Sequence, residues 1–209
     1  IHIPFCVRKC LYCDFYSIPT GKGPVSRRLN ELEMEHQPDF IDALERELAA
    51  VTKELVPDTV FIGGGTPTEL SDRDFQRMFD VVHRHIDLSR VTEWTCESNP
   101  GTLTEAKVDI MLAFGVNRVS LGVQSLTPSV LEFVGRIHSP EEAVEGYELL
   151  RRKNVRNINL DFMYGIPGQT LDDIERDLTR AIALGPEHLA CYCLIFEDGT
   201  PLTELRNKG

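Results

Sequence analysis

The chain has little positive charge for its size. Its 209 residues include 22 Lys and Arg against 33 Asp and Glu, which gives a formal net charge of −11. Proteins that bind nucleic acid need clustered Lys and Arg to neutralise phosphates, so this balance argues against a nucleic-acid partner. The one dense basic run, at residues 151–153, is typical of the last turn of a helix, where cations suit the dipole.

Residues 1–209 contain no long apolar run and no stretch typical of a signal peptide. No run approaches the roughly 20 apolar residues of a membrane-spanning helix. The chain begins at Ile1, in a run typical of a strand, and we expect a fragment of a longer protein that comprises one globular domain over residues 1–209. Six cysteines without a secreted disulfide framework favour a reducing, cytoplasmic compartment.

Three of these cysteines stand close together. Cys6, Cys10 and Cys13 form the pattern Cys-x3-Cys-x2-Cys directly behind an apolar run. Thiolates at this spacing converge on a soft metal centre, and an iron–sulfur cluster is a usual occupant. A cluster of four irons with three protein ligands keeps one iron open to a further ligand, much as a catalytic zinc keeps an open position. The triplet therefore indicates a reaction site.

Two other interpretations of the cysteines are open. A structural zinc could take these three thiolates with His2 or a distant residue, although zinc ligands usually come as separated pairs. Unligated thiols are the second alternative, since disulfides between such near neighbours form poorly. The remaining cysteines, Cys96, Cys191 and Cys193, are expected to be small apolar residues in buried strands.

Apolar runs alternate with amphipathic stretches along the chain. Strands are predicted at Ile1 and at residues 59–62, 91–97, 118–123, 157–162 and 188–195. Helices are predicted near 40–55, 71–86, 104–115, 128–134, from residue 139 and over 170–185, and residues 21–37 are predicted to be a surface excursion. Repeated βα units imply a parallel sheet with right-handed crossovers, but periodicity does not separate a barrel from a doubly wound sheet.

The motifs follow the predicted strands, where parallel α/β folds carry their chemistry. GGGTP, residues 63–67, would let a ligand approach the backbone closely, or is only a tight turn. Glu97 would accept hydrogen bonds from a ligand amine or hydroxyl, or is an ordinary loop acid. Farther along, Arg136 would hold a carboxylate in bidentate fashion, and Asp161 would accept from two ribose hydroxyls.

The string HIPFCVRKCLYCDF, residues 2–15, resembles the signature of the radical S-adenosylmethionine proteins, with Tyr12 as the aromatic residue before the third cysteine. Within them it resembles the oxygen-independent coproporphyrinogen III oxidase family, and most of all its heme-chaperone branch of the HemW type. The resemblance implies an α/β fold, a partial (β/α)6 TIM-like barrel. It also implies a 4Fe–4S cluster on Cys6, Cys10 and Cys13 whose open iron binds S-adenosylmethionine. Further contacts to that cofactor would come from Tyr12, Gly64, Gly65, Thr66, Glu97, Gln124, Arg136, Asp161 and Ile195.

The chain departs from the oxidase branch at Phe15, where that branch has a fourth cysteine. The family's tyrosine ahead of the His-x-Pro run and its C-terminal domain lie outside the chain. Phe15 argues against coproporphyrinogen dehydrogenase activity and favours a heme chaperone. Such a protein would bind heme or porphyrin, pass heme to heme-acceptor proteins, and take electrons from a donor such as flavodoxin or ferredoxin. The oxidase, and a radical enzyme with another substrate, are the alternatives.

Overall fold

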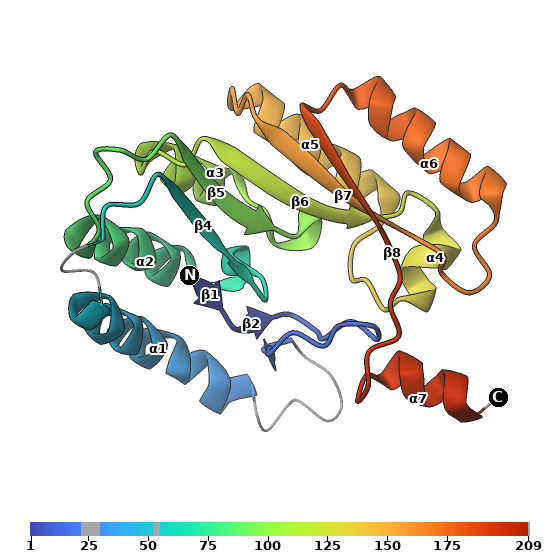
Figure 1. The fold of residues 1–209 in the computed structure, drawn as a ribbon, viewed down its shortest axis with the longest axis horizontal. Coiled ribbons are helices and arrows are strands. Elements are labelled where there is room, and N and C mark those ends of the chain that lie inside the picture. Colours follow the sequence, from blue (N-terminus) through green and yellow to red (C-terminus); the bar gives the residue numbers. More distant parts are fainter. Residues whose placement is uncertain (22–29, 52–54, 209) are drawn as a thin grey trace.

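The computed structural model describes residues 1–21, 30–51 and 55–208, and for residues 30–36 it describes the backbone alone. Its main sheet has six parallel strands (Figure 1). In spatial order they are β1 (His2–Ile3), β4 (Thr59–Gly64), β5 (Glu93–Ser98), β6 (Arg118–Gln124), β7 (Ile158–Tyr164) and β8 (His188–Cys193). A second, two-stranded parallel sheet joins β2 (Phe5–Cys6) to β3 (Ile18–Pro19).

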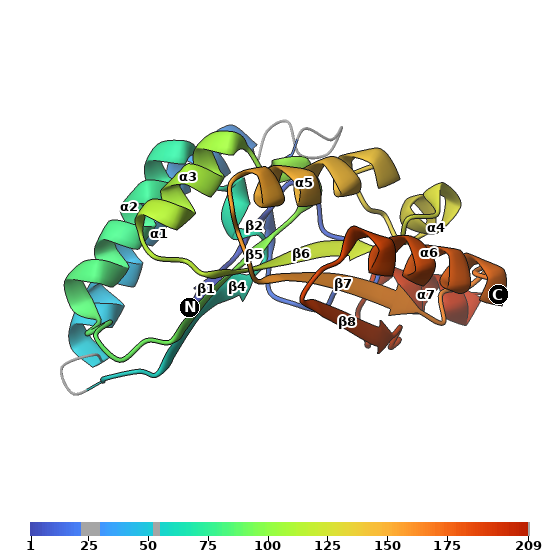
Figure 2. The same ribbon diagram turned by 90° about the horizontal axis from the view of Figure 1, so that it is seen from above.

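Helices connect the strands of the main sheet. They are α1 (Asn30–Val51), α2 (Asp72–His85), α3 (Glu105–Ala113), α4 (Pro128–Phe133), α5 (Pro140–Arg152) and α6 (Leu171–Leu184), and a further helix, α7 (Pro201–Lys208), follows β8. Short 3₁₀ helices, η1 (Pro67–Glu69) and η2 (Pro100–Thr102), follow β4 and β5. Seen from above, α1, α2, α3, α5 and α6 lie along the convex face of a curved sheet (Figure 2). No helix among the described residues is both long and apolar enough to cross a membrane.

Strand order decides the architecture that periodicity left open. In a doubly wound sheet the order reverses at a switch point and helices cover both faces. Here the order β1-β4-β5-β6-β7-β8 follows the chain without a reversal. Because every right-handed crossover leads to the next position, the sheet curls in one direction, as in a barrel. The predicted partial barrel of six βα units is therefore confirmed.

The first helix differs from its prediction. It begins at Asn30 and contains Pro38, whereas the sequence pattern placed its start near residue 40. Residues 30–37 are rich in Glu, Leu, Met and Gln, which favour helix without an apolar period that would reveal it. The other part of the predicted excursion, residues 22–29, lies outside the described residues. Strands β2 and β3, of two residues each, and helix α7 were not predicted.

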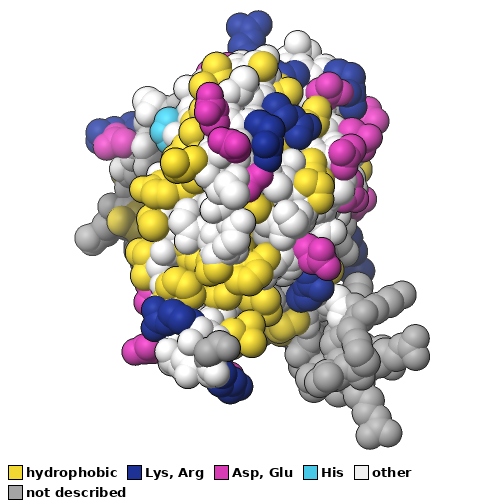
Figure 3. Space-filling view, turned by 90° about the vertical axis from the view of Figure 1, so that its right-hand side faces the viewer, with side chains coloured by type: hydrophobic (Ala, Val, Ile, Leu, Met, Phe, Trp, Pro, Cys, Tyr) yellow, Lys and Arg dark blue, Asp and Glu magenta, His cyan; other side chains and the backbone are white. Residues whose placement is uncertain are grey.

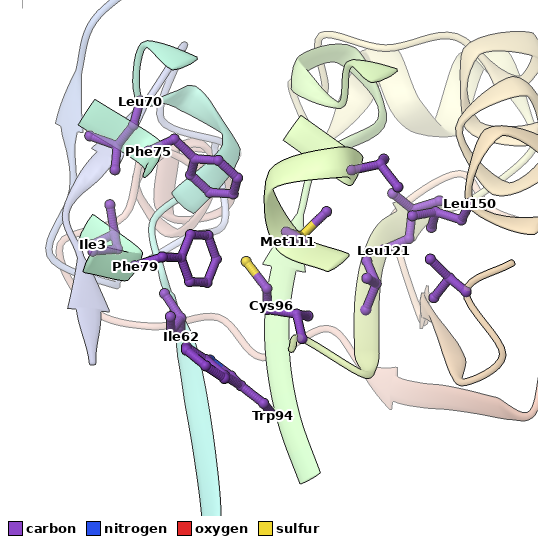
Figure 4. Packing of buried hydrophobic residues seen from close by; sticks show 14 of the residues in the cluster. Ile3, Ile62, Leu70, Phe75, Phe79, Trp94, Cys96, Met111, Leu121 and Leu150 are labelled. Carbon is purple, nitrogen blue, oxygen red and sulfur yellow. The ribbon is translucent and has the colours of Figure 1, made fainter. Parts of the chain in front are cut away.

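The core lies between the sheet and its helices (Figure 4). Phe79 of α2 is fully buried, and its ring lies 5.5 Å from that of Trp94 on β5. Cys96, on the same strand, is also fully buried, as predicted. A smaller apolar cluster forms around Val134, Met163 and Leu202, and the partly buried Leu11 and Tyr12 of the cysteine segment pack against it. The segment that carries the three cysteines is thus anchored to the far end of the sheet.

The prediction that Cys191 and Cys193 are buried is wrong, because both are exposed. They belong to β8, the last strand of the described sheet, which has a neighbouring strand on one side only. The side of the molecule that carries α6, β8 and α7 also displays gathered hydrophobic side chains (Figure 3). Ile195 and Leu205 near this end of the chain are 65% and 54% exposed.

Local signals at helix ends agree with the structure. Ser139 accepts a hydrogen bond from the Glu142 amide at 3.1 Å, and Glu142 accepts one from the Ser139 amide at 2.7 Å. This reciprocal capping box begins α5, and Thr170 with Asp173 forms another at α6. Each satisfies amides that have no partner within the helix.

We expect Ser139→Ala to lower the free energy of unfolding by about 1 kcal/mol, because the Glu142 amide loses its acceptor. Urea denaturation at neutral pH measures this change. Thr179→Ala, at an exposed position of α6, serves as the control and should stay within about 0.5 kcal/mol of the parent. Equal stability of the two variants would contradict the capping interpretation.

Candidate functional site

One pocket lies at the carboxyl ends of the strands and collects most of the residues singled out from the sequence. Its lining includes Cys6, Cys10, Tyr12, Cys13, Gly64, Gly65, Thr66, Glu97, Gln124, Arg136 and Asp161. These residues come from the cysteine segment, from the four strands β4 to β7 or the turns that follow them, and, for Arg136, from the loop between α4 and α5. Ile195 is the exception. It lies two residues beyond the end of β8, is 65% exposed and is not part of the lining.

Backbone hydrogen bonds hold the cysteine segment over the pocket. The Leu11 amide donates to the Val134 carbonyl at 3.2 Å, and the Leu202 amide donates to the Leu11 carbonyl at 2.9 Å. The guanidinium of Arg8 adds side-chain hydrogen bonds to the carbonyls of Gly135 and Arg136, at 2.7 and 3.1 Å. A side chain at Gly135 would lie 3.2 Å from Leu11, so the two loops are in close contact. Partners distant in sequence therefore determine where the thiols lie.

A zinc ion and a 4Fe–4S cluster would require different spacings of the three thiols. Among the described residues, no three His, Cys, Asp or Glu side chains are placed to ligate one metal ion. Zinc would need its ligands about 2.3 Å from one centre. In a 4Fe–4S cluster each thiolate binds a different iron, so the ligands stand farther apart. Burial raises the pKa of Cys6 and Cys13, and iron would have to displace their protons on binding.

The glycine turn after β4 brings two backbones into close contact. The Gly65 amide donates to the Ile3 carbonyl, and the Thr66 amide to the Phe5 carbonyl, both at 2.7 Å. A Cβ on Gly65 would lie only 2.7 Å from the Phe5 oxygen and 2.8 Å from the Ile3 oxygen. Gly64 has φ of +107°, a conformation that other residues rarely adopt. The turn is therefore required for the cysteine segment to lie where it does, in addition to any contact with a ligand.

Two carboxylates face the pocket without an ion-pair partner in the described part of the chain. Glu97 accepts a hydrogen bond from the Gly64 amide at 2.9 Å. Asp161 accepts one from Asn159 at 2.6 Å and one from Ser120 at 3.0 Å. Burial raises the pKa of both carboxyls and outweighs these hydrogen bonds, and Asp161 raises the pKa of Glu97 further. A cationic or hydroxyl-bearing ligand would relieve this unfavourable environment.

Arg136 supplies the opposite charge. It donates to the Gly122 carbonyl at 2.6 Å and to the Cys10 sulfur at 3.5 Å, while its buried Nε has no partner. Burial alone would lower the pKa of Arg136, but neighbouring Cys10 and Tyr12 outweigh it and raise the pKa. A buried donor without a partner is unfavourable, and a ligand carboxylate is the group an arginine holds best. The donors and acceptors of the pocket thus suit an amino acid such as the methionine part of S-adenosylmethionine.

Gln124 ends β6 in a strained conformation. Its φ is +68°, which costs a non-glycine residue about 1–2 kcal/mol. The only other described non-glycine residue with positive φ is Asn154, which follows the end of α5, a position where this conformation is common. Tyr192 of β8 donates its hydroxyl hydrogen to Gln124 Oε1 at 2.5 Å. Strain of this kind at a pocket wall is a recognised sign of a functional residue.

The sequence prediction omits Tyr192, which lines the pocket. The available signal was the alternation of strand side chains, since Tyr192 must face away from Cys191 and Cys193. His2, named above as a possible zinc ligand, hydrogen-bonds the Tyr16 carbonyl at 2.9 Å and packs against Gly64, so its contacts in the structure are structural. Phe15 lies at the pocket and is 60% exposed.

We expect Gly65→Ala to displace the cysteine segment, because fixed backbone oxygens occupy the space of the new methyl group. After anaerobic reconstitution, iron and sulfide content per chain should fall by at least half. Gly101→Ala is the matched control, since its methyl group would meet nothing closer than 3.5 Å. Full iron loading of Gly65→Ala would contradict the role of this close contact.

Glu97→Gln should stabilise the protein without bound ligands at neutral pH, by about 0.5–2 kcal/mol. The folded-state pKa of Glu97 is raised, so the folded protein keeps its proton where the unfolded chain, with a pKa of about 4.3, has lost it. The contribution of Glu97 to the free energy of unfolding therefore falls as the pH rises from the unfolded-state pKa to the folded-state pKa. The melting temperature of the variant should exceed that of the parent at pH 7, and the difference should vanish toward pH 4. Glu175→Gln, at an exposed position, is the control and should leave the melting temperature at the parent value at both pH 7 and pH 4. If the difference in melting temperature between Glu97→Gln and the parent grew on acidification, the raised pKa of Glu97 would be refuted.

Comparison with known proteins agrees with this geometry. The protein is 38% identical over 212 residues to the heme chaperone HemW of Bacillus subtilis, covering 100% of this chain and 53% of that protein. It is 41% identical over 202 residues to the Escherichia coli protein of the same name, covering 96% and 51%. The fold matches coproporphyrinogen III oxidase (HemN) of Escherichia coli, described as a radical SAM enzyme, with a TM-score of 0.80 and 24% identity over 99% of this chain and 50% of that one.

This chain thus spans about half the length of the curated relatives it matches. The family model of the radical SAM superfamily matches residues 1–181, which include all three cysteines of the pocket and every strand up to β7. The chain is homologous over its whole length to proteins named heme chaperones, and it belongs to the radical SAM superfamily.

Proposed function

We propose that this chain is the cluster-binding and S-adenosylmethionine-binding part of a heme chaperone. One observation carries the proposal. The cysteine segment meets two partly buried carboxylates and a partly buried arginine at a single pocket, in a chain homologous to proteins named heme chaperones. Heme or porphyrin is the proposed cargo, and the cytoplasm the proposed location. Heme-acceptor proteins, and an electron donor such as flavodoxin or ferredoxin, are the proposed partners.

The pocket residues suggest a division of roles. Cys6, Cys10 and Cys13 would hold the cluster, which when bound supplies an electron to the sulfonium of S-adenosylmethionine. Arg136 would direct its unpartnered Nε to the ligand carboxylate. Glu97 would accept hydrogen bonds from the ligand amine. The positive charge of that amine would offset the repulsion between the Glu97 and Asp161 carboxylates.

The other contacts would orient the nucleoside. Asp161, held by Asn159 and Ser120, would accept from the ribose hydroxyls. Gln124 would contribute its amide from the strained end of β6, and the turn at residues 64–66 would present backbone groups to the methionine part. Tyr12 packs against the smaller apolar cluster and would exclude water from one side of the site.

Phe15 supports the chaperone over the oxidase. The oxidase branch has a fourth cysteine at this position, and here an apolar ring stands at the pocket. Within the described lining the cysteines of the triplet are the only thiols. The fourth cysteine of the oxidase branch is therefore missing from this pocket.

The test uses the protein expressed from its complete gene and reconstituted anaerobically with iron and sulfide. Heme titration should give a saturable shift of the Soret band, and coproporphyrinogen III should be recovered unchanged. Conversion of coproporphyrinogen III to protoporphyrinogen would overturn the chaperone proposal in favour of the oxidase. Absence of heme binding together with absence of that conversion would favour a radical enzyme with another substrate.

Cys10→Ala should abolish the broad iron–sulfur absorbance at about 400 nm, because the cluster loses one of three ligands. Cys193→Ala is the matched control: it removes an exposed thiol outside the pocket and should leave the absorbance unchanged. Bound zinc without iron or sulfide in the parent protein would overturn the cluster assignment itself.

A further inference from the structure

The strained end of β6 is held by a helix that has no side chain in the pocket. Where β6 pairs with β7, the register shifts between Gly122 and Gln124, so the strand bulges there. The Ser125 amide then donates to the Val123 carbonyl at 2.9 Å, which closes a three-residue turn around Gln124. A turn of this kind with positive φ at its centre is rare and strained. Something outside the turn must hold it.

Asp177 of α6 is the group placed to do so. Its carboxylate is buried, with 3% exposure, and accepts hydrogen bonds from two hydroxyls of the loop after the turn. Ser125 donates to one oxygen, and Thr127 donates to the other at 3.1 Å. Ser125 Oγ in turn accepts the Thr127 amide at 3.0 Å. The loop therefore closes on a single carboxylate that comes from about 50 residues later in the chain.

Two further contacts complete the arrangement. Arg180, one turn after Asp177 on α6, donates to the Leu126 carbonyl at 3.3 Å. From the other side, His138 Nε2 lies 3.0 Å from the Val123 carbonyl, which can only accept, so that nitrogen carries the hydrogen. Val123 O thus takes two donors, one from the turn itself and one from the loop that also bears Arg136. Gln124 lies between these supports with its side chain in the pocket.

An ion pair does not explain why the Asp177 carboxylate is buried. Within the described residues it makes no ion pair, although Arg176 and Arg180 are on the same helix; Arg176 pairs with Asp173 instead. A carboxylate is rarely buried unless its oxygens are satisfied, and here hydroxyls of one short loop satisfy it. The geometry is that of a clamp from α6 onto residues 125–127.

We infer that Asp177 is a positioning residue for the ligand pocket: through Ser125 and Thr127 it holds Gln124 in its left-handed conformation, with the amide directed to S-adenosylmethionine. The inference rests on the proposed function for the identity of the ligand. The position of the turn itself does not depend on that identity. Because the clamp lies on α6, the helix between β7 and β8, it also couples the far part of the barrel to the wall contributed by β6.

The test compares Asp177→Leu with Asp172→Leu, the same change at an exposed position of the same helix. Both are made in the complete, reconstituted protein. Isothermal titration should show S-adenosylmethionine binding at least tenfold more weakly to Asp177→Leu, while the iron content and the cluster absorbance stay at the parent level. Asp172→Leu should match the parent in all three. A general loss of structure would lower the iron content as well, so this combination separates positioning from misfolding.

A second measurement does not need the ligand. Amide hydrogen exchange, read by mass spectrometry, should be at least tenfold faster in peptides covering residues 123–127 of Asp177→Leu and unchanged in β5. If Asp177→Leu does not fold, Thr127→Val, which removes one donor of the clamp, takes its place with a smaller effect in the same direction. Parent-like exchange and parent-like affinity would overturn the inference. Faster exchange in a protein whose parent binds no S-adenosylmethionine would refute the proposed function and leave the clamp standing.

Discussion

The close contact between the glycine turn after β4 and the segment that leads to the cysteines is the constraint on which the site depends. At Gly65 the two backbones are too close for any side chain, and the amides of Gly63, Gly65 and Thr66 bond to carbonyls of the first five residues. This fixes the height of the cysteine segment above the sheet. Thr66 and Arg136 reach the thiols of Cys6 and Cys10 because that segment lies so near the strand ends.

The pocket combines groups that are unfavourable in the protein alone. Two carboxylates with raised pKa, a guanidinium with one buried and unpartnered nitrogen, and a residue with positive φ all reduce stability. The free-energy cost of these groups comes from desolvation and backbone strain. A ligand that carries a cation, a carboxylate and hydroxyls would reduce the desolvation cost of the charged groups together. The stability needed to hold such a site comes from the apolar core between sheet and helices and from the smaller cluster that anchors Leu11 and Tyr12.

Supports of the pocket come from residues that the sequence does not mark as functional. Asp177, Thr127 and Tyr192 lie far apart in the chain, and each would be interpreted as an ordinary residue of its helix, loop or strand. Their roles follow from contacts over about 50 to 70 residues, which no local pattern encodes. For Gln124, the sequence pattern predicted the place at a strand end. Its positive φ, however, depends on a register shift between β6 and β7, which the sequence pattern does not show.

Local and short-range information in the sequence determined much of this protein. Periodicity and capping residues were enough for all six strands of the main sheet and most helices, because these signals act within a few residues. Three cysteines at close spacing, with the string around them, were enough to indicate the family. Periodicity left the choice between a barrel and a doubly wound sheet open, and strand order settled it in favour of the barrel that the family resemblance implies. Tertiary structure alone decided that β8 leaves Cys191 and Cys193 exposed, and that Ile195 is exposed and not part of the pocket lining. These outcomes depend on which strands become neighbours and which strand ends the sheet, and pairing between distant segments sets both.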